Sequence, residues 1–181
     1  SGRNHRKSFA DSSFCDEICD TMLNRVALIT GVGPGLGAAL ARRFAREGFQ
    51  VGLVARSSDF IQALAQEISA SGPRAISVVA DVSRPAEARG AVQRVRENLG
   101  SIGVLVHNPS SALGQGLLAT TPEQFEQSWR VAALGGFVCA QETASDMLQA
   151  GDGVMLFTGA TSSVRGGGWL AFSSAKIAVR G

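Results

Sequence analysis

The stretch TGVGPGLG, residues Thr30–Gly37, decides the fold of this chain. It follows the apolar run RVALIT at residues 25–30, which is typical of a buried strand. It precedes LGAALARRFAREG at residues 36–48, which has the spacing of an amphipathic helix. Glycines often make ordinary turns, but a glycine-rich turn between a strand and a helix is the context of a dinucleotide site. The order of these segments therefore favours dinucleotide binding over a purely structural turn.

Three glycines in this stretch have separate tasks. Gly31 allows the tight turn, Gly35 has no side chain to block a pyrophosphate, and Gly37 lets the helix pack close to the sheet. The helix start offers free N–H groups and the positive end of the helix dipole to phosphates. We therefore expect Thr30, Gly31, Gly35, Leu36 and Gly37 to lie against a bound dinucleotide.

Strand and helix patterns alternate through the rest of the chain. Thr121, Pro122 and Gln124 also predict a capped helix start with a capping box. The expected strands lie at 25–30, 50–55, 74–80, 102–107 and 153–159, and the expected helices at 36–48, 59–72, 85–100, from 121 onward, and from near Trp169. Short apolar strands that alternate with helices indicate an α/β fold with a parallel sheet. We predict a three-layer, doubly wound Rossmann-type sheet of about five strands in the order 3-2-1-4-5.

Residues 1–21 differ from the rest of the chain, because they mix charges of both signs and show neither a helix nor a strand period. They are predicted to form a flexible extension, either an artificial or translational addition or a genuine disordered arm. The dinucleotide-binding domain is predicted to span residues 22–181. No apolar core of a signal peptide is visible at the start of the chain.

Composition narrows the class of protein. The chain has 181 residues, of which 45% are hydrophobic and 18% charged, so a single globular domain is expected. The net charge of +2 gives no argument for binding nucleic acid or an anionic membrane. The uncharged run at residues 26–41 is too short and too rich in glycine to span a bilayer. Cys15 and Cys19 lack a second pair, so no metal site is predicted, and the cysteine usage fits a reducing, cytoplasmic location.

The residue after the second expected strand indicates which dinucleotide is preferred. An NAD site usually places an acidic residue there, on the ribose hydroxyls. This chain has Arg56, Ser57 and Ser58 instead, and a guanidinium can bind a 2′-phosphate with two hydrogen bonds. The alternative is a solvated surface arginine, and Asp59 nearby argues for NAD(H). We expect NADP(H) to be favoured over NAD(H).

These features together resemble the short-chain dehydrogenase/reductase family from residue 24 to the end of the chain. TGVGPGLG resembles the family's TGxxxGxG, ADV resembles the segment after its third strand, LVHNPS resembles LVNNAG, and FSSAK resembles YxxxK with the tyrosine lost. The resemblance implies that Asp81 contacts the adenine ring, and that Val82 and Asn108 also lie at the cofactor. It implies that Lys176 binds the nicotinamide ribose and that Phe172 replaces the catalytic tyrosine.

Three of the four catalytic positions that the resemblance implies are changed. Ala132 stands where the asparagine of the proton relay is expected, and Gly159 or Ala160 where the serine is expected. With Phe172 in place of tyrosine, only Lys176 remains. The family implies hydride transfer between NADP(H) and a small carbonyl or alcohol. The losses predict weak or absent catalysis, and a dinucleotide-binding pseudoenzyme that acts as a regulatory or partner subunit stays the alternative.

Lys176 also stands out by composition, because it is the one lysine from Met22 onward, where the other basic residues are arginines. An ammonium with three donors suits two ribose hydroxyls, and a solvated helix lysine is the alternative. His107 is expected to pack and bond locally rather than to act as an acid. Three aromatic residues are expected in the core: Trp129, Phe137 and Trp169.

The resemblance also implies a longer parent protein, because a full family member continues beyond the helix that carries Lys176. The strand run VMLF at 154–157 is therefore expected at an uncovered sheet edge. The full-length parent is expected to be a homo-oligomer. The substrate cannot be named, because the segments that would shape its pocket are not in the sequence.

Overall fold

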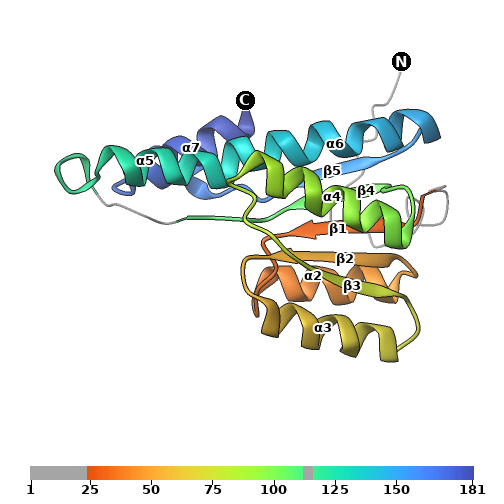
Figure 1. Ribbon diagram of the computed structural model, residues 1–181. Helices are drawn as coiled ribbons and strands as arrows, with labels where there is room; N and C mark the ends of the chain where they lie inside the picture. The colour runs from red at the N-terminus through yellow and green to blue at the C-terminus, as the bar shows by residue number, and fades with distance from the viewer. Residues whose placement is uncertain (1–23, 112–115) are drawn as a thin grey trace, which may run out of the picture.

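The computed structural model describes residues 24–111 and 116–181, which form a five-stranded parallel sheet flanked by helices (Figure 1). The strands are β1 (Val26–Thr30), β2 (Gln50–Ala55), β3 (Ala75–Val79), β4 (Val104–His107) and β5 (Val154–Phe157). Their order in the sheet is β3-β2-β1-β4-β5, which confirms the predicted α/β class and strand order. Residues 1–21, with Cys15 and Cys19, lie outside the described residues.

The helices follow the predicted segments closely. They are α2 (Leu36–Arg46), α3 (Ser58–Ala70), α4 (Pro85–Leu99), α5 (Pro122–Trp129), α6 (Gly135–Ala150) and α7 (Leu170–Arg180). Two short 3₁₀ turns, η1 (Leu117–Ala119) and η3 (Thr161–Ser163), and a π-helical turn, η2 (Arg130–Leu134), complete the described elements. The sequence patterns did not predict these three turns. Across residues 24–111 and 116–181, no helix combines the length and apolar composition that a membrane span requires.

The predicted capping box at the start of α5 is confirmed. The Thr121 hydroxyl accepts a hydrogen bond from the Gln124 amide at 3.2 Å, and the Gln124 side chain accepts one from the Thr121 amide at 3.0 Å. Pro122 occupies the first helical position, where its missing N–H would have no partner in any case. Local sequence therefore fixes where α5 begins.

Two apolar cores lie on opposite faces of the sheet. Helices α2 and α3 cover one face, and α4 and α6 cover the other (Figure 1). Ile29 and Leu53 point into the first core, and Leu28 and Leu105 into the second, and all four are fully buried. Burial on both faces explains why these strands are apolar throughout rather than alternating with polar residues.

The strand connections reverse direction next to β1. The chain proceeds from β1 outward to β2 and β3, then crosses back to β4, which pairs with the other side of β1. Thr30, at the carboxyl end of β1, lies opposite Val54 of β2 and His107 of β4. Ligands of open parallel sheets bind where the strand order reverses, at the carboxyl ends of the strands.

Strand β5 lies at the edge of the sheet and pairs only with β4 among the described strands. Leu156 and Phe157 are 44% and 39% exposed, so the expectation of an uncovered edge is confirmed.

The prediction that three aromatic residues belong to the core is wrong. Trp129, Phe137 and Trp169 are 40%, 61% and 49% exposed. They lie on α5, on α6 and at the start of α7, with much of each side chain open to solvent.

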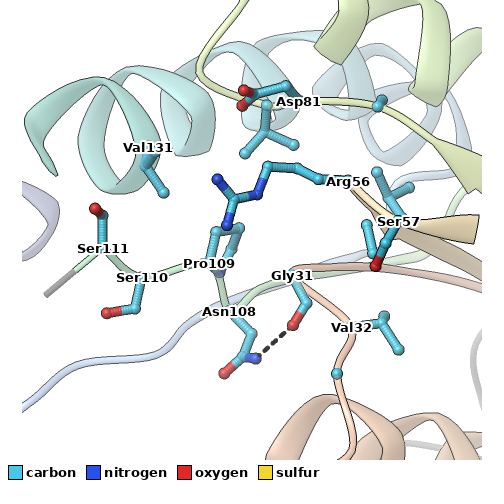
Figure 2. A pocket seen from close by; sticks show the side chains of 15 residues that line it. Gly31, Val32, Arg56, Ser57, Asp81, Asn108, Pro109, Ser110, Ser111 and Val131 are labelled. Atoms are coloured by element: carbon cyan, nitrogen blue, oxygen red, sulfur yellow. Dashed lines mark hydrogen bonds between the residues drawn. The ribbon is translucent and has the colours of Figure 1, made fainter. Parts of the chain in front are cut away.

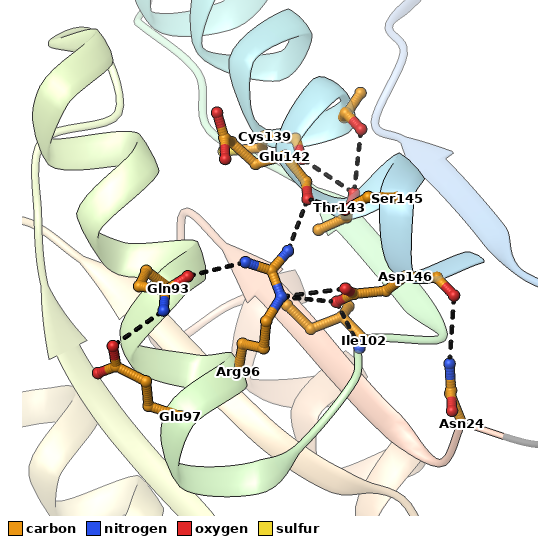
Figure 3. Close-up of polar contacts among 11 residues, drawn as sticks. Asn24, Gln93, Arg96, Glu97, Ile102, Cys139, Glu142, Thr143, Ser145 and Asp146 are labelled. Atoms are coloured by element: carbon orange, nitrogen blue, oxygen red, sulfur yellow. Dashed lines mark hydrogen bonds and ion pairs between the residues drawn. The ribbon is translucent and has the colours of Figure 1, made fainter. Parts of the chain in front are cut away.

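A partly buried polar cluster ties the entry to β4 to helices α4 and α6 (Figure 3). The Arg96 side chain of α4 donates to both carboxylate oxygens of Asp146 in α6, at 3.0 and 3.1 Å, and to the Glu142 carbonyl at 2.7 Å. The Ile102 amide, which precedes β4, donates to Asp146 at 2.9 Å. One carboxylate thus links α4, α6 and the entry to β4 at the end of the sheet remote from the carboxyl ends.

Candidate functional site

A cleft of about 380 Å³ opens at the carboxyl ends of β1, β2 and β4 (Figure 2). Its walls come from the loop after β1, the ends of β2 and β3, the loop after β4, and η2. The residues that line it include Gly31, Val32, Gly33, Arg56, Ser57, Asp81, Val82, Asn108, Pro109, Ser110, Ser111 and Val131. The sequence-predicted residues Gly31, Arg56, Asp81, Val82 and Asn108 therefore come together at one place.

The glycine loop lies very close to neighbouring backbone at two of its glycines. Gly31 has a φ of +72°, and a Cβ atom there would lie 2.5 Å from the backbone nitrogen of Pro109. A Cβ at Gly37 would lie 2.9 Å from the Cα of Val32, whereas one at Gly35 would meet no atom within 4 Å. Gly31 and Gly37 are thus required by the fold, and Gly35 leaves open space beside the loop.

Helix α2 starts at this loop, and no acidic side chain in its first turn offsets the positive amino-terminal end of the helix dipole. Its first turn has no side-chain cap and no acidic residue. By contrast, α3, α4 and α5 each carry an acidic residue in the first turn. An uncapped helix start retains donors and a positive partial charge for an anion. Leu36, the first residue of α2, is exposed at this position.

Arg56 extends from the end of β2 across the cleft, between Asp81 and Pro109 (Figure 2). Its side chain is exposed, and within residues 24–111 and 116–181 it has no hydrogen bond or ion pair. Other arginines nearby are engaged, as Arg84 is with Glu87 at 2.9 Å. The Arg56 guanidinium is therefore a cation in the cleft, and no described residue occupies the position of a ligand beside it.

Asp81 is oriented by its own loop. One of its carboxylate oxygens accepts a hydrogen bond from the Ser83 amide at 3.0 Å, and the Asp81 amide donates to Glu87 at 2.8 Å. That amide and the Arg84 side chain hold the pKa of Glu87 below its ordinary value. Within the described part of the chain, the second carboxylate oxygen of Asp81 has no hydrogen bond.

A chain of hydrogen bonds runs from the glycine loop to the lysine. The Asn108 amide donates to the Gly31 carbonyl at 3.0 Å (Figure 2), and its carbonyl oxygen accepts from the Thr158 hydroxyl at 2.9 Å. Lys176 Nζ donates to the Thr158 carbonyl at 2.7 Å and to the Pro109 carbonyl at 3.5 Å. The position of the Thr158 hydroxyl against Asn108 has no signal in the sequence.

Lys176 lies behind the cleft rather than in its lining. It is 4% exposed, and burial lowers its pKa below the ordinary value. Its Nζ lies 6.0 Å from the ring centre of Phe172, which is half-buried one helical turn earlier. No carboxylate among the described residues pairs with Lys176.

Thr30 and His107 form a buried pair beneath the cleft. The Thr30 hydroxyl lies 2.9 Å from His107 Nδ1, and His107 Nε2 lies 3.3 Å from the Val131 carbonyl. Burial lowers the pKa of His107 to about 4. His107 therefore packs and bonds locally, as predicted, and the Thr30 hydroxyl is engaged away from the cleft lining.

The other positions that the resemblance singled out carry no group that can exchange a proton. Ala132 lies in the turn η2, and Gly159 and Ala160 follow β5. The described residues also contain no cluster of three His, Cys, Asp or Glu side chains suited to a metal ion. The arrangement is that of a nucleotide cleft with a buried lysine behind it.

Comparisons with known proteins agree with this arrangement. The family profile described as short chain dehydrogenase matches residues 25–181. A short-chain dehydrogenase/reductase from Armillaria gallica is 33% identical over 162 residues, which are 87% of this chain and 62% of that protein. This chain therefore spans less than two thirds of the length of that relative.

Two solved structures share the fold and hold nucleotides. The blue fluorescent protein from a metagenomic library, in complex with NADPH, has a TM-score of 0.78 at 30% identity, over 86% of this chain and 64% of that protein. The alcohol dehydrogenase from the archaeon Thermococcus sibiricus, complexed with 5-hydroxy-NADP, has a TM-score of 0.81 at 29% identity, over 86% and 67%. With the strand order and the glycine loop, the profile match establishes that this chain belongs to the short-chain dehydrogenase/reductase family.

Proposed function

We propose that the chain binds NADP(H) in the cleft at the carboxyl ends of β1, β2 and β4, as the dinucleotide-binding domain of an oxidoreductase. The parent activity is hydride transfer to or from a small carbonyl or alcohol. The observation that carries the proposal is Arg56, an unpartnered guanidinium that extends across the cleft toward the loop after β4. An NADP(H) site needs such a cation, and an NAD(H) site has no use for it.

The residues present fit an NADP(H) molecule. The uncapped start of α2 and the open space at Gly35 suit a pyrophosphate. Arg56 suits a 2′-phosphate, and the free carboxylate oxygen of Asp81 suits the exocyclic amine of adenine. When bound, the nicotinamide supplies the hydride donor or acceptor.

Lys176 is assigned to the nicotinamide ribose. An ammonium has three donors, and two of them go to the Thr158 and Pro109 carbonyls. The third remains for a ribose hydroxyl, and the carbonyls fix the direction in which it points. Burial lowers the pKa of this amine, and no carboxylate among the described residues offsets that shift.

An oxidoreductase with this chain would lack the side chains that normally transfer the proton to or from the substrate. Phe172, Ala132, Gly159 and Ala160 have no side chain that exchanges a proton. Positioned acid–base catalysis typically contributes about 10²- to 10⁴-fold, so turnover should be slow by that factor. Phe172 in particular favours the second candidate function, a dinucleotide-binding pseudoenzyme that acts as a regulatory or partner subunit. NADPH consumption with a panel of small carbonyls separates the two functions.

Replacing Arg56 with alanine is expected to weaken NADPH binding by about 10- to 30-fold, the lower part of the range for charge-assisted hydrogen bonds at an exposed site. NADH binding should change by less than about twofold, because NADH has no 2′-phosphate to lose a partner. Both affinities can be measured by fluorescence titration of the reduced cofactor.

Arg94→Ala is the matched control, because Arg94 is an exposed arginine on α4 that does not line the cleft. It removes the same charge and should leave both affinities unchanged. If NADPH affinity fell equally in Arg56→Ala and Arg94→Ala, the net charge of the protein alone would explain the loss. The assignment of Arg56 to the 2′-phosphate would then be withdrawn.

Restoring a phenol with Phe172→Tyr is expected to raise NADPH consumption by this chain by less than about tenfold. The new hydroxyl would have Lys176 within one helical turn, but Ala132, Gly159 and Ala160 would still lack the groups that orient a substrate. Groups that act as a unit are not restored one at a time. Rapid turnover by the unmodified chain would contradict this expectation, because some other group would then have to supply the proton.

A further inference from the structure

His107 is a buried titratable residue that the proposed function does not use. It is 3% exposed at the carboxyl end of β4, directly beneath the cleft. Its ring touches two different parts of the fold, the end of β1 through Thr30 and the π-helical turn η2 through Val131. Val131 in turn lines the cleft.

The turn η2 changes the hydrogen-bond partner of the Val131 carbonyl. The Gly135 amide donates to the Arg130 carbonyl, five residues earlier, instead of to Val131 four residues earlier as in an α-helix. The Val131 carbonyl therefore loses its ordinary α-helical partner. His107 Nε2, at 3.3 Å, takes that place and satisfies a buried carbonyl.

The start of α6 is built to let the ring approach. A Cβ atom at Gly136 would lie 3.1 Å from His107 Cδ2 and 3.1 Å from Phe157 Cε1. One at Gly135 would lie 2.7 Å from the Val82 carbonyl oxygen. Two successive glycines weaken a helix, so their presence directly after η2 is explained by this close seating against His107 and Val82.

The hydrogen bonds determine the tautomer of His107. Burial holds the pKa of His107 near 4, with the charge of Lys176 adding to the shift, so the ring is neutral at neutral pH and has one N–H. The Val131 carbonyl can only accept, so Nε2 carries the proton. Nδ1 then accepts from the Thr30 hydroxyl at 2.9 Å, which holds the ring from the side of β1.

We propose that His107 is a positioning residue: by bridging Thr30 and the Val131 carbonyl it fixes the π-helical turn and thereby the Val131 wall of the cleft. The part that concerns cofactor affinity rests on the proposed function. The part that concerns the turn rests on the structure alone, so the two can fail separately.

The test compares two amides that mimic different ring nitrogens. His107→Gln keeps a donor near the Nε2 position, whereas His107→Asn reaches only the Nδ1 position. Hydrogen–deuterium exchange of the peptide that covers residues 129–136 should become about tenfold faster in the Asn variant, the fold-change expected for one lost hydrogen bond. The Gln variant should stay within about threefold of the wild type, and NADPH affinity should fall by about three- to tenfold in the Asn variant only.

Two further variants keep the test decisive. Thr30→Val has nearly the same volume but removes the hydroxyl that holds Nδ1, so it should speed exchange of residues 129–136 as His107→Asn does. Thr143→Val is the control, because it removes a buried hydroxyl that donates to the Cys139 carbonyl at 2.9 Å further along α6. It should leave both exchange at 129–136 and NADPH affinity unchanged.

Equal exchange in the Gln and Asn variants, or unchanged exchange at residues 129–136 in His107→Asn, would overturn the proposal. Faster exchange with unchanged NADPH affinity would overturn the link from the turn to the cleft. If the wild-type chain bound no NADPH, the proposed function would fail, and the exchange comparison would still decide whether His107 holds the turn.

Discussion

Replacing Asp146 with alanine is expected to lower the free energy of unfolding by about 3–5 kcal/mol, the usual cost of removing one partner of a buried ion pair. The side chain of Asp146 is 9% exposed and that of Arg96 is 25% exposed. The substitution would leave the Arg96 guanidinium and the Ile102 amide without the acceptor that they share (Figure 3). Urea denaturation followed by circular dichroism measures the loss.

A loss of this size is a large fraction of the total stability of a domain, which is typically about 5–15 kcal/mol. Glu67→Gln is the control, because Glu67 pairs with Arg42 at 2.6 Å on the surface, where both side chains are about half exposed. Surface pairs contribute little, so this variant should unfold at nearly the wild-type urea concentration. Similar midpoints for Asp146→Ala and Glu67→Gln would show that the partly buried cluster does not hold α4 and α6 to the sheet.

Gly31→Ala is expected to reduce NADPH affinity by more than about 100-fold, because the loop could keep neither its turn nor its distance from Pro109. The φ of +72° is strained for any residue with a Cβ, at a cost of about 1–2 kcal/mol. The added Cβ would also lie 2.5 Å and 2.7 Å from the nitrogen and Cα of Pro109, which are backbone atoms that cannot rotate away. The loops after β1 and β4 would both have to move.

Gly48→Ala separates backbone strain from the clash. Gly48 has a φ of +81° and lies after α2, where an added Cβ would meet no atom within 4 Å. It should lose stability through strain and keep NADPH affinity, whereas Gly31→Ala should lose both. Calorimetric titration and thermal unfolding on both variants check this. Retained affinity in Gly31→Ala would show that the glycine loop does not shape the binding site.

Much of the fold could be predicted because its determinants are local. Each strand is a short apolar run, and β1, β2 and β4 are buried on both faces. Each helix has an apolar stripe, so element type follows from the period of the sequence. The start of α5 was predicted to the residue because its capping box involves Thr121 and Gln124 alone. Gly31 and Arg56 followed from the pattern of a dinucleotide site. Asp81, Val82 and Asn108 followed from the resemblance to the family.

The features that the sequence did not predict depend on contacts between distant segments. The π-helical turn at Arg130–Leu134 arises where α6 approaches Val82 and His107, and no local pattern encodes that approach. The link between Arg96 and Asp146 joins residues fifty positions apart. The exposure of Trp129, Phe137 and Trp169 could not be read from residue type, because burial depends on which element covers each helix.

The central claim is that the cleft binds NADP(H) and distinguishes it from NAD(H). Calorimetric titration of the unmodified 181-residue chain with NADPH and with NADH tests it most directly. We expect saturable binding of NADPH with a dissociation constant at least about tenfold lower than that for NADH. Equal affinity for the two cofactors, or no binding of either, would contradict the claim.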